Sequence, residues 1–154
     1  RRFREAFSKI NGYFGDCYEK LFGGGRARLR IQDENHILES GIEIEVQPPG
    51  KKMRNLSLFS GGERALTVIA LLFALLTYQP APFVILDEID APLDETNIDR
   101  FAQFLKAYGQ KTQFIVITHR KGTMEAADVL HGVTMEESGV SRVLSVKLSE
   151  VPES

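Results

Sequence analysis

Two short segments of this chain carry residue types that could act on a phosphate anhydride. The sequence SGGE at residues 60–63 places a glycine pair where a helix should begin, and FVILDE at 83–88 is an apolar run that ends in Asp87 and Glu88. Backbone N–H groups at a helix start bind anions, whereas adjacent carboxylates can hold Mg²⁺ and orient an attacking water. The phosphate-cradling loop G-x-x-x-x-G-K-[ST] does not occur in the sequence. The two segments therefore predict parts of a nucleotide-hydrolysing site whose third part is missing.

Each segment also has a structural explanation. Ser60 at an N-cap with Glu63 three residues later is a capping box. That motif does not explain Gly61 and Gly62, because a glycine costs a helix interior about 1 kcal/mol relative to alanine, and somewhat less in the first turn. The glycines favour phosphate binding over capping alone. The acidic pair, taken by itself, is more typical of a strand that ends in a turn.

Asp94 and His119 follow the same logic. Asp94 is a good N-cap for the next predicted helix. His119 comes just after the apolar run 114–117, and a lone histidine is more often structural. At the end of a neighbouring buried strand, however, His119 would lie near Glu88 and a terminal phosphate. The other histidines and the single cysteine give no metal-ligand spacing.

The elements predicted around these residues form an α/β layer, because strands that are apolar throughout alternate with helices. Residues 83–86 and 114–117 are typical of strands covered on both faces, and 63–78 is apolar nearly all round, as a core helix is. Alternating strands at 27–31 and 41–46 could pair Arg28 and Arg30 with Glu43 and Glu45. Further helices are predicted at 94–108 and 121–127, and a closing hairpin at 129–135 and 143–148.

The N-terminal segment predicts a helix with an apolar stripe. Its apolar residues from Phe3 to Leu21 step by four and three residues, and three glycines at 23–25 end the helix. An ordinary amphipathic helix and the foot of a coiled coil both fit this stripe, and the stripe alone favours the ordinary helix. No N-cap opens the helix, so we expect it to continue upstream.

Length and composition indicate a single globular domain. The chain has 154 residues and a net charge of −2, with eight Lys or Arg in residues 1–31 and six Asp or Glu in 85–100. The longest nearly apolar run, 65–78, is shorter than the roughly 20 residues that span a bilayer, so we expect no membrane partner. The lone Cys17 fits a reducing cytosol.

The order of the motifs is more specific than any one of them. FSGGE, FVILDE, APLD and ITH, in this order, resemble the C-terminal lobe of an ABC-type ATPase head. The longer stretches NLSLFSGGERALTVIALLFALL, LDEIDAPLDETN and FIVITHRKGTMEAADVLHGVTMEESGVS are similar to the C-terminal head segment of a bacterial SMC (structural maintenance of chromosomes) protein of the Firmicutes type, as are LFGGGRARLR and VQPPGKK. The resemblance covers essentially the whole chain.

The resemblance implies a division of the chain and roles for its residues. Residues 1–22 would be the foot of a returning coiled-coil helix, and 23–154 the C-terminal lobe, an α/β unit with a buried sheet, flanking helices and a closing β-hairpin. ATP and Mg²⁺ would bind at a site that is incomplete without an N-terminal lobe. Ser60, Gly61 and Gly62, beside Glu63, would contact the γ-phosphate of the ATP bound to a second head. Asp87 would support Mg²⁺, and Glu88 would be the catalytic base. Asp94 would lie at the head–head seam, and His119 near the γ-phosphate.

The resemblance also implies partners and a cellular role. The implied role is that of an ATPase for chromosome condensation and segregation, which would act in the cytoplasm at the nucleoid. Its partners would be the N-lobe, a second head, a kleisin subunit bound through the terminal hairpin, and DNA bound without sequence preference. The isolated chain would be inactive. Charge alone makes Arg26, Arg28, Lys51, Lys52, Arg54, Lys111 and Lys121 candidates for DNA contact.

Two departures and two alternatives accompany this interpretation. Phe59 replaces the leucine that is usual before Ser60 in this family. Pro92 stands where a small residue is common in the loop after the acidic pair, and proline stiffens that loop because it fixes φ. Another ABC-type ATPase, either a RecN-like repair protein or a transporter, is one alternative, and a non-catalytic partner-binding module is another. Glu63 and the helix that leads into the lobe argue against a transporter.

Overall fold

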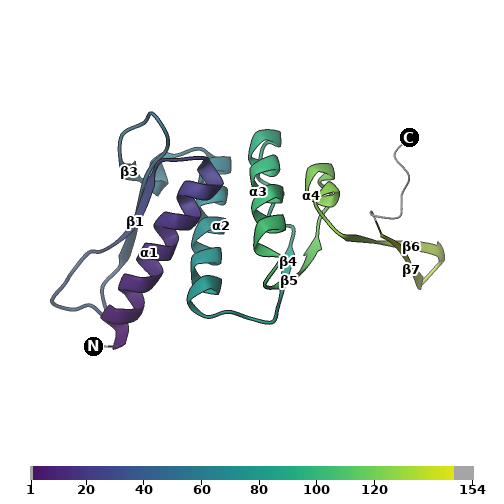
Figure 1. Cartoon of the computed structure of the whole chain (residues 1–154), viewed down its shortest axis with the longest axis horizontal. Coiled ribbons are helices and arrows are strands. Elements are labelled where there is room, and N and C mark those ends of the chain that lie inside the picture. The colour runs from purple at the N-terminus through teal and green to yellow at the C-terminus, as the bar shows by residue number, and fades with distance from the viewer. Residues whose placement is uncertain (1, 148–154) are drawn as a thin grey trace.

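Three helices pack side by side; two small sheets lie against them, and a third extends away from them (Figure 1). The computed structural model describes residues 2–147, without the side chains of 136 and 137. In chain order the elements are α1 (Arg2–Phe22), β1 (Arg26–Ile31), β2 (Ile42–Gln47), β3 (Arg54–Asn55), the 3₁₀ helix η1 (Leu56–Leu58), α2 (Gly61–Tyr78), β4 (Phe83–Asp87), α3 (Glu95–Tyr108), β5 (Gln113–Ile117), α4 (Lys121–Glu125), β6 (Val129–Glu137) and β7 (Val140–Lys147).

The order of the predicted helices and strands agrees with the structure. The short strand β3 and the 3₁₀ helix η1 were not predicted, and the other differences lie at the ends of elements. Helix α4 ends at Glu125 rather than Ala127, because Ala126 caps it with its backbone N–H. The hairpin strands β6 and β7 are longer than predicted and meet at a turn in which Gly139 has a φ of 83°. That left-handed conformation suits glycine. The predicted last strand residue, Leu148, lies outside the described residues.

Helix α2 is the central helix of the core. Ser60 caps its start with the full capping box predicted from the sequence, and the helix stops before the prolines at 80 and 82. Its 18 residues have a mean hydropathy of 1.4, enough by length and composition alone to cross a membrane. One face of the helix packs against α1 and α3. Its buried residues are Leu66, Thr67, Ile69, Ala70, Phe73 and Ala74. This packing accounts for only part of the apolar composition, because Val68 and Leu75 on the same helix are 53% and 44% exposed.

An aromatic cluster joins α2 to α3 and β5. Phe73 is fully buried, and its ring centroid lies 4.9 Å from Phe104, 5.0 Å from Tyr108 and 5.6 Å from Phe114. Two of these contacts are edge-on, a favoured geometry for aromatic rings. The cluster fixes α2 relative to the sheet that carries the acidic pair.

Replacing Phe73 by alanine should therefore destabilise this chain by about 3–5 kcal/mol, the range for emptying a buried aromatic site. Urea unfolding followed by circular dichroism measures the change. Phe83→Ala is the matched control, because Phe83 is 54% exposed and should lose much less. Equal losses for the two variants would contradict this account of the core.

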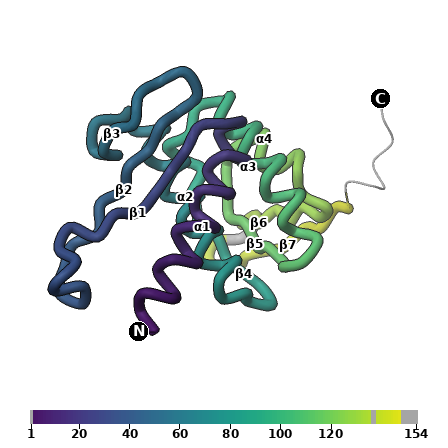
Figure 2. Tube along the Cα trace, turned by 60° about the vertical axis from the view of Figure 1, so that its left-hand side comes forward, coloured from purple at the N-terminus to yellow at the C-terminus, as the bar shows by residue number. Residues whose placement is uncertain are grey.

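The sheet β1–β2–β3 is antiparallel and lies beside α1, at the opposite end of the row of helices from α4 (Figure 1, Figure 2). Arg28 stands opposite Glu45, and Arg30 opposite Glu43, as the alternation predicted. Arg28 Nε lies 2.6 Å from Glu45 Oε2, and Arg30 pairs with both glutamates. These charges therefore hold the two strands in register.

The sheet β4–β5 is parallel but covered on one face only. Leu86 is buried in the core, whereas the alternate residues Phe83, Ile85, Ile115 and Ile117 are 46–57% exposed. The continuous apolar pattern predicted strands covered on both faces. Within residues 2–147, no element covers the second face, so the pattern describes a surface that another segment would have to bury.

Helix α1 changes character along its length. From Phe14 to Phe22 one side of the helix is buried against α2 and β1, whereas Phe3, Phe7 and Ile10 are only partly buried. The same apolar stripe thus enters the core at its C-terminal half and leaves it at its N-terminal half. Phe7 and Ile10 still pack against the edge of the core, whereas Phe3 does not, so the first turn offers its apolar side to another helix.

Candidate functional site

The start of α2 presents an open backbone. Ser60 Oγ accepts a hydrogen bond from Glu63 N at 3.4 Å, and Ser60 N donates to Glu63 Oε2 at 3.3 Å. This capping box accounts for Ser60 and Glu63 but not for the glycines. A Cβ at Gly61 would meet nothing within 4 Å, and one at Gly62 would meet only ordinary contacts, the nearest being Pro92 O at 3.6 Å.

Neither glycine has a positive φ. Nothing within the described residues therefore requires glycine at either position. The open space over the first turn, at the positive end of the helix dipole, suits an anion that approaches from outside.

Lys51 neutralises the carboxylate beside this open turn. Lys51 Nζ lies 2.8 Å from Glu63 Oε1. Its hydrogen bond is the largest cause that holds the pKa of Glu63 below the usual value, and hydrogen bonds from Ser60 act in the same direction. A paired Glu63 opposes a neighbouring phosphate less than a bare carboxylate would.

From the sequence, Lys51 was a candidate for DNA contact instead. The ion pair with Glu63 was not predicted, because the two residues are twelve apart and no local pattern indicates the pairing. Arg28 and Lys121, which are further DNA candidates, also pair with carboxylates, Glu45 and Glu125. Three of the residues that were DNA-contact candidates by charge alone are therefore paired with carboxylates of this chain.

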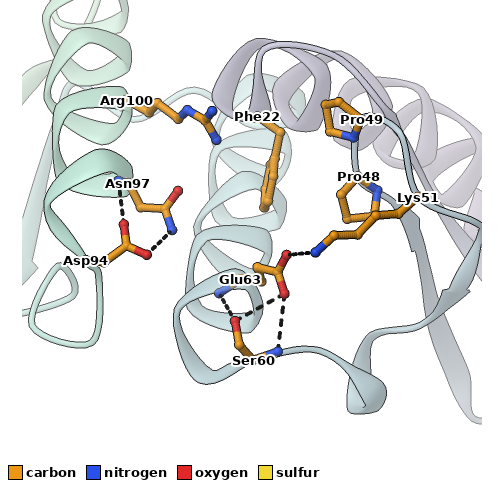
Figure 3. A pocket seen from close by; sticks show the side chains of 9 residues that line it. All are labelled: Phe22, Pro48, Pro49, Lys51, Ser60, Glu63, Asp94, Asn97 and Arg100. Atoms are coloured by element: carbon orange, nitrogen blue, oxygen red, sulfur yellow. Dashed lines mark hydrogen bonds and ion pairs between the residues drawn. The ribbon is translucent and has the colours of Figure 1, made fainter.

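Ser60, Glu63 and Asp94 line one pocket of about 510 Å³ (Figure 3). Asp94 caps α3 as predicted, accepting from Asn97 N at 2.9 Å, and Asn97 Nδ2 donates to the other carboxylate oxygen at 3.2 Å. The pocket is lined by Phe22, Pro48, Pro49, Lys51, Ser60, Glu63, Asp94, Asn97 and Arg100. Asn97 and Arg100 were missed from the sequence, although their spacing from Asp94 along one helix face could have indicated them.

The carboxyl edge of the β4–β5 sheet brings the acidic pair together with the predicted histidine. Asp87 is in register with Ile117, and Glu88 N donates to Ile117 O at 2.9 Å. His119, two residues past this strand end, has Nδ1 3.8 Å from Glu88 Oε1. Both side chains are exposed, so they face the space beyond the sheet edge. Parallel pairing of the two strands is what places them side by side.

The backbone of Glu88 adopts a left-handed conformation, with a φ of 48°. Such a value is uncommon for a residue other than glycine and costs free energy. Ala91 N donates to Glu88 O at 3.1 Å, which closes a turn after the strand. The strained residue is thus the one predicted to be the catalytic base, and no sequence signal marks the strain.

Asp87 has no metal-ligand cluster around it in the described part of the chain. Among the described residues, no group of three His, Cys, Asp or Glu side chains is arranged to hold a metal ion. A protein usually binds Mg²⁺ through one or two carboxylates plus phosphates and water. An exposed aspartate at a strand end fits such a site if a phosphate supplies the remaining ligands.

The family follows from a comparison with known proteins. Residues 25–142 match the family described as the RecF/RecN/SMC N terminal domain. The chain belongs to the RecF/RecN/SMC family. Chromosome partition protein Smc of Bacillus subtilis (strain 168) is 63% identical over 153 residues, which are 99% of this chain and 13% of that protein. The chain thus spans a small part of this relative.

Solved structures of SMC heads share the fold. A chain described under ATP-driven dimerization and DNA stimulated activation of SMC ATPases has a TM-score of 0.86 at 42% identity, over 96% of this chain and 89% of that one. The Pyrococcus furiosus Smc head domain with an extended coiled coil, bound to the C-terminal domain of ScpA, has a TM-score of 0.80 at 43% identity, over 93% and 36%. The SMC resemblance and the α/β head fold predicted from the sequence are confirmed, and these relatives favour SMC over a transporter or RecN.

Proposed function

We propose that this chain is the C-terminal half of an SMC ATPase head, which hydrolyses ATP only together with an N-terminal lobe that carries the P-loop. The observation that carries the proposal is the half-covered sheet β4–β5, with Asp87, Glu88 and His119 at its carboxyl edge. An exposed apolar sheet face beside such a group of side chains calls for a second lobe that covers the one and completes the other.

Asp87 is the residue that would hold Mg²⁺ at this edge. When bound, the ion neutralises charge on the phosphates of ATP. Glu88, next to it, accepts a proton from the attacking water or orients that water. His119 lies beside Glu88, and its imidazole would donate a hydrogen bond to a terminal phosphate at this edge. These roles require a phosphate chain held by the N-lobe over the sheet edge.

Ser60, Gly61 and Gly62 serve a second ATP, held by another head. Their open helix start faces outward with no side chain above Gly61, as a surface that receives a phosphate from a partner must. Glu63, paired with Lys51, supports Ser60 through the capping box. Asp94 lies on the same pocket as Ser60, which supports a role for it at the proposed seam between the heads.

The remaining parts of the chain make the other contacts of the head. Residues 1–22 are the foot of the returning coiled coil, because the stripe on α1 leaves the core toward its N-terminal end. Residues 23–154 form the lobe itself. The hairpin β6–β7 extends away from the helices (Figure 1) and exposes Val133, Val143 and Leu144 by 61–71%. This surface is the proposed kleisin contact.

The full protein would use ATP to engage and release its heads on DNA during chromosome condensation and segregation. Support comes from the similarity to Smc and from the SMC heads cited above. DNA contact without sequence preference would rest on phosphate charges and fall steeply with salt. Such a protein acts in the cytoplasm, at the nucleoid.

The isolated chain should neither bind ATP tightly nor hydrolyse it, because no P-loop occurs in its sequence. Phosphate release is measured for the chain alone, for the matching N-lobe alone, and for the two combined, each with and without Mg²⁺. Only the combination with Mg²⁺ should turn over. Turnover by the chain alone would contradict the proposal, and an inactive combination that nevertheless forms a complex would favour a non-catalytic binding module.

A further inference from the structure

Asp90 is a fully buried carboxylate in the turn between Glu88 and Asp94, with 0% of its surface exposed. Its Oδ2 accepts hydrogen bonds from two hydroxyls, Thr118 Oγ1 at 2.7 Å and Thr123 Oγ1 at 2.5 Å. Its Oδ1 has no hydrogen-bond partner within the described part of the chain. None of the roles proposed above uses this side chain.

Stability alone does not explain a carboxylate at this position. Burying an acidic group costs free energy unless charges or several hydrogen bonds compensate for it. Here the compensation is two neutral hydroxyls on one oxygen, while the other oxygen is left bare. A neutral side chain with one acceptor would meet both hydroxyls at a lower cost. Both hydroxyls belong to the segment around His119, so the side chain of Asp90 joins the turn after β4 to that segment.

The two threonines bracket His119. Thr118 immediately precedes the histidine, and its Oγ1 also accepts from Arg120 N at 2.9 Å. Thr123 lies on α4, which begins just after Arg120. Asp90 is thus hydrogen-bonded to the chain on both sides of His119. The Thr118 hydroxyl also links Asp90 to Arg120, the residue after the histidine.

Two further contacts fix the same loop to the turn and to α3. Arg120 Nη2 donates to Leu93 O at 2.7 Å. A Cβ at Gly122 would lie 2.7 Å from Ile98 Cγ2, so α4 sits directly on α3 at that point. These contacts hold the ends of the loop around His119. The hydrogen bonds of Asp90 then determine the position of the segment that carries His119.

We propose that Asp90 is a positioning residue, which holds His119 beside Glu88 by fixing Thr118 and Thr123. This inference rests on the role of His119 in the proposed function. Because the same turn carries Glu88 at one end and Asp94 at the other, Asp90 ties the loop with the histidine to the segment that reaches the head–head seam.

The test uses the full-length protein that contains this segment and measures kcat and KM for ATP. Asp90→Ala removes the grip and should lower kcat about 10- to 100-fold, the loss expected when a reacting group is displaced by about an ångström, while KM changes less than about threefold. Asp90→Asn keeps an acceptor for the threonine hydroxyls and should recover most of the turnover. Thr77→Val, which removes a part-buried hydroxyl at the far end of α2, is the control and should leave kcat unchanged.

A double-mutant cycle with His119→Ala separates positioning from a general loss of structure. If Asp90 acts through His119, then adding Asp90→Ala to His119→Ala should lower kcat less than about twofold further. Independent, multiplying losses would overturn the inference. Thr123→Val removes one of the two grips with little change in shape, and a normal kcat in that variant together with a normal kcat in Asp90→Ala would also overturn it.

The same cycle distinguishes this inference from the proposed function. Normal turnover of His119→Ala would refute the role of the histidine and the inference with it. A slow His119→Ala beside a normal Asp90→Ala would refute the inference alone. Should Asp90→Ala fail to fold, Thr123→Val decides the question: its kcat should be lower than that of Thr77→Val, and an equal kcat in these two variants would overturn the inference.

Discussion

Glu88→Gln in a complete head should leave ATP binding intact and slow hydrolysis by about 10²- to 10⁴-fold, the usual contribution of a positioned general base. Glutamine has nearly the shape of glutamate but cannot take a proton from water. The side chain is exposed at the sheet edge and lies beside His119, so its replacement disturbs no packing. Phosphate release in a single turnover measures hydrolysis, and equilibrium binding of labelled ATP measures affinity.

Glu43→Gln provides the matched control for this variant. Glu43 is a half-buried glutamate on β2 that pairs with Arg30, away from the edge of the β4–β5 sheet. Its variant should hydrolyse ATP at the rate of the unchanged protein. Wild-type turnover of Glu88→Gln would remove Glu88 as the base, and lost ATP binding would show that the residue serves binding instead.

Much of the fold could be predicted from the sequence because local signals and packing agree. The capping box at Ser60 and the prolines after Tyr78 set the ends of α2, and alternating charges set the register of Arg28 with Glu45. The meeting of Glu88 and His119 also followed from sequence, because the ends of neighbouring parallel strands lie at one edge.

Other features depend on contacts between distant segments, which no local pattern encodes. A continuous apolar strand predicts burial on both faces but does not say which segment supplies the cover, so the exposed face of Ile85 and Ile115 was not foreseen. The pairing of Lys51 with Glu63 and the burial of Asp90 were missed for the same reason. The strain at Glu88 was missed because glutamate carries no preference for a positive φ.

Ser60→Arg should abolish ATP-driven pairing of two heads. Ser60 lies at the mouth of the open helix start, and a long cationic side chain there fills the space over Gly61 that the proposed phosphate requires. Loss of the cap itself costs only about 0.5–2 kcal/mol, too little to unfold the head. Sedimentation velocity of complete heads with ATP, in the Glu88→Gln background, measures the pairing.

Two companion variants separate the possible causes of that loss. Ser60→Ala removes the cap and the hydroxyl but leaves the space open, so pairing should weaken without disappearing. Ser8→Arg adds the same charge and bulk at an exposed position on α1 and should pair normally. If Ser60→Ala were as defective as Ser60→Arg, the cap would be the function of Ser60. If both paired normally, no phosphate would enter here. Only loss confined to the arginine at position 60, with partial weakening by alanine, requires a second head's phosphate over Gly61 and Gly62.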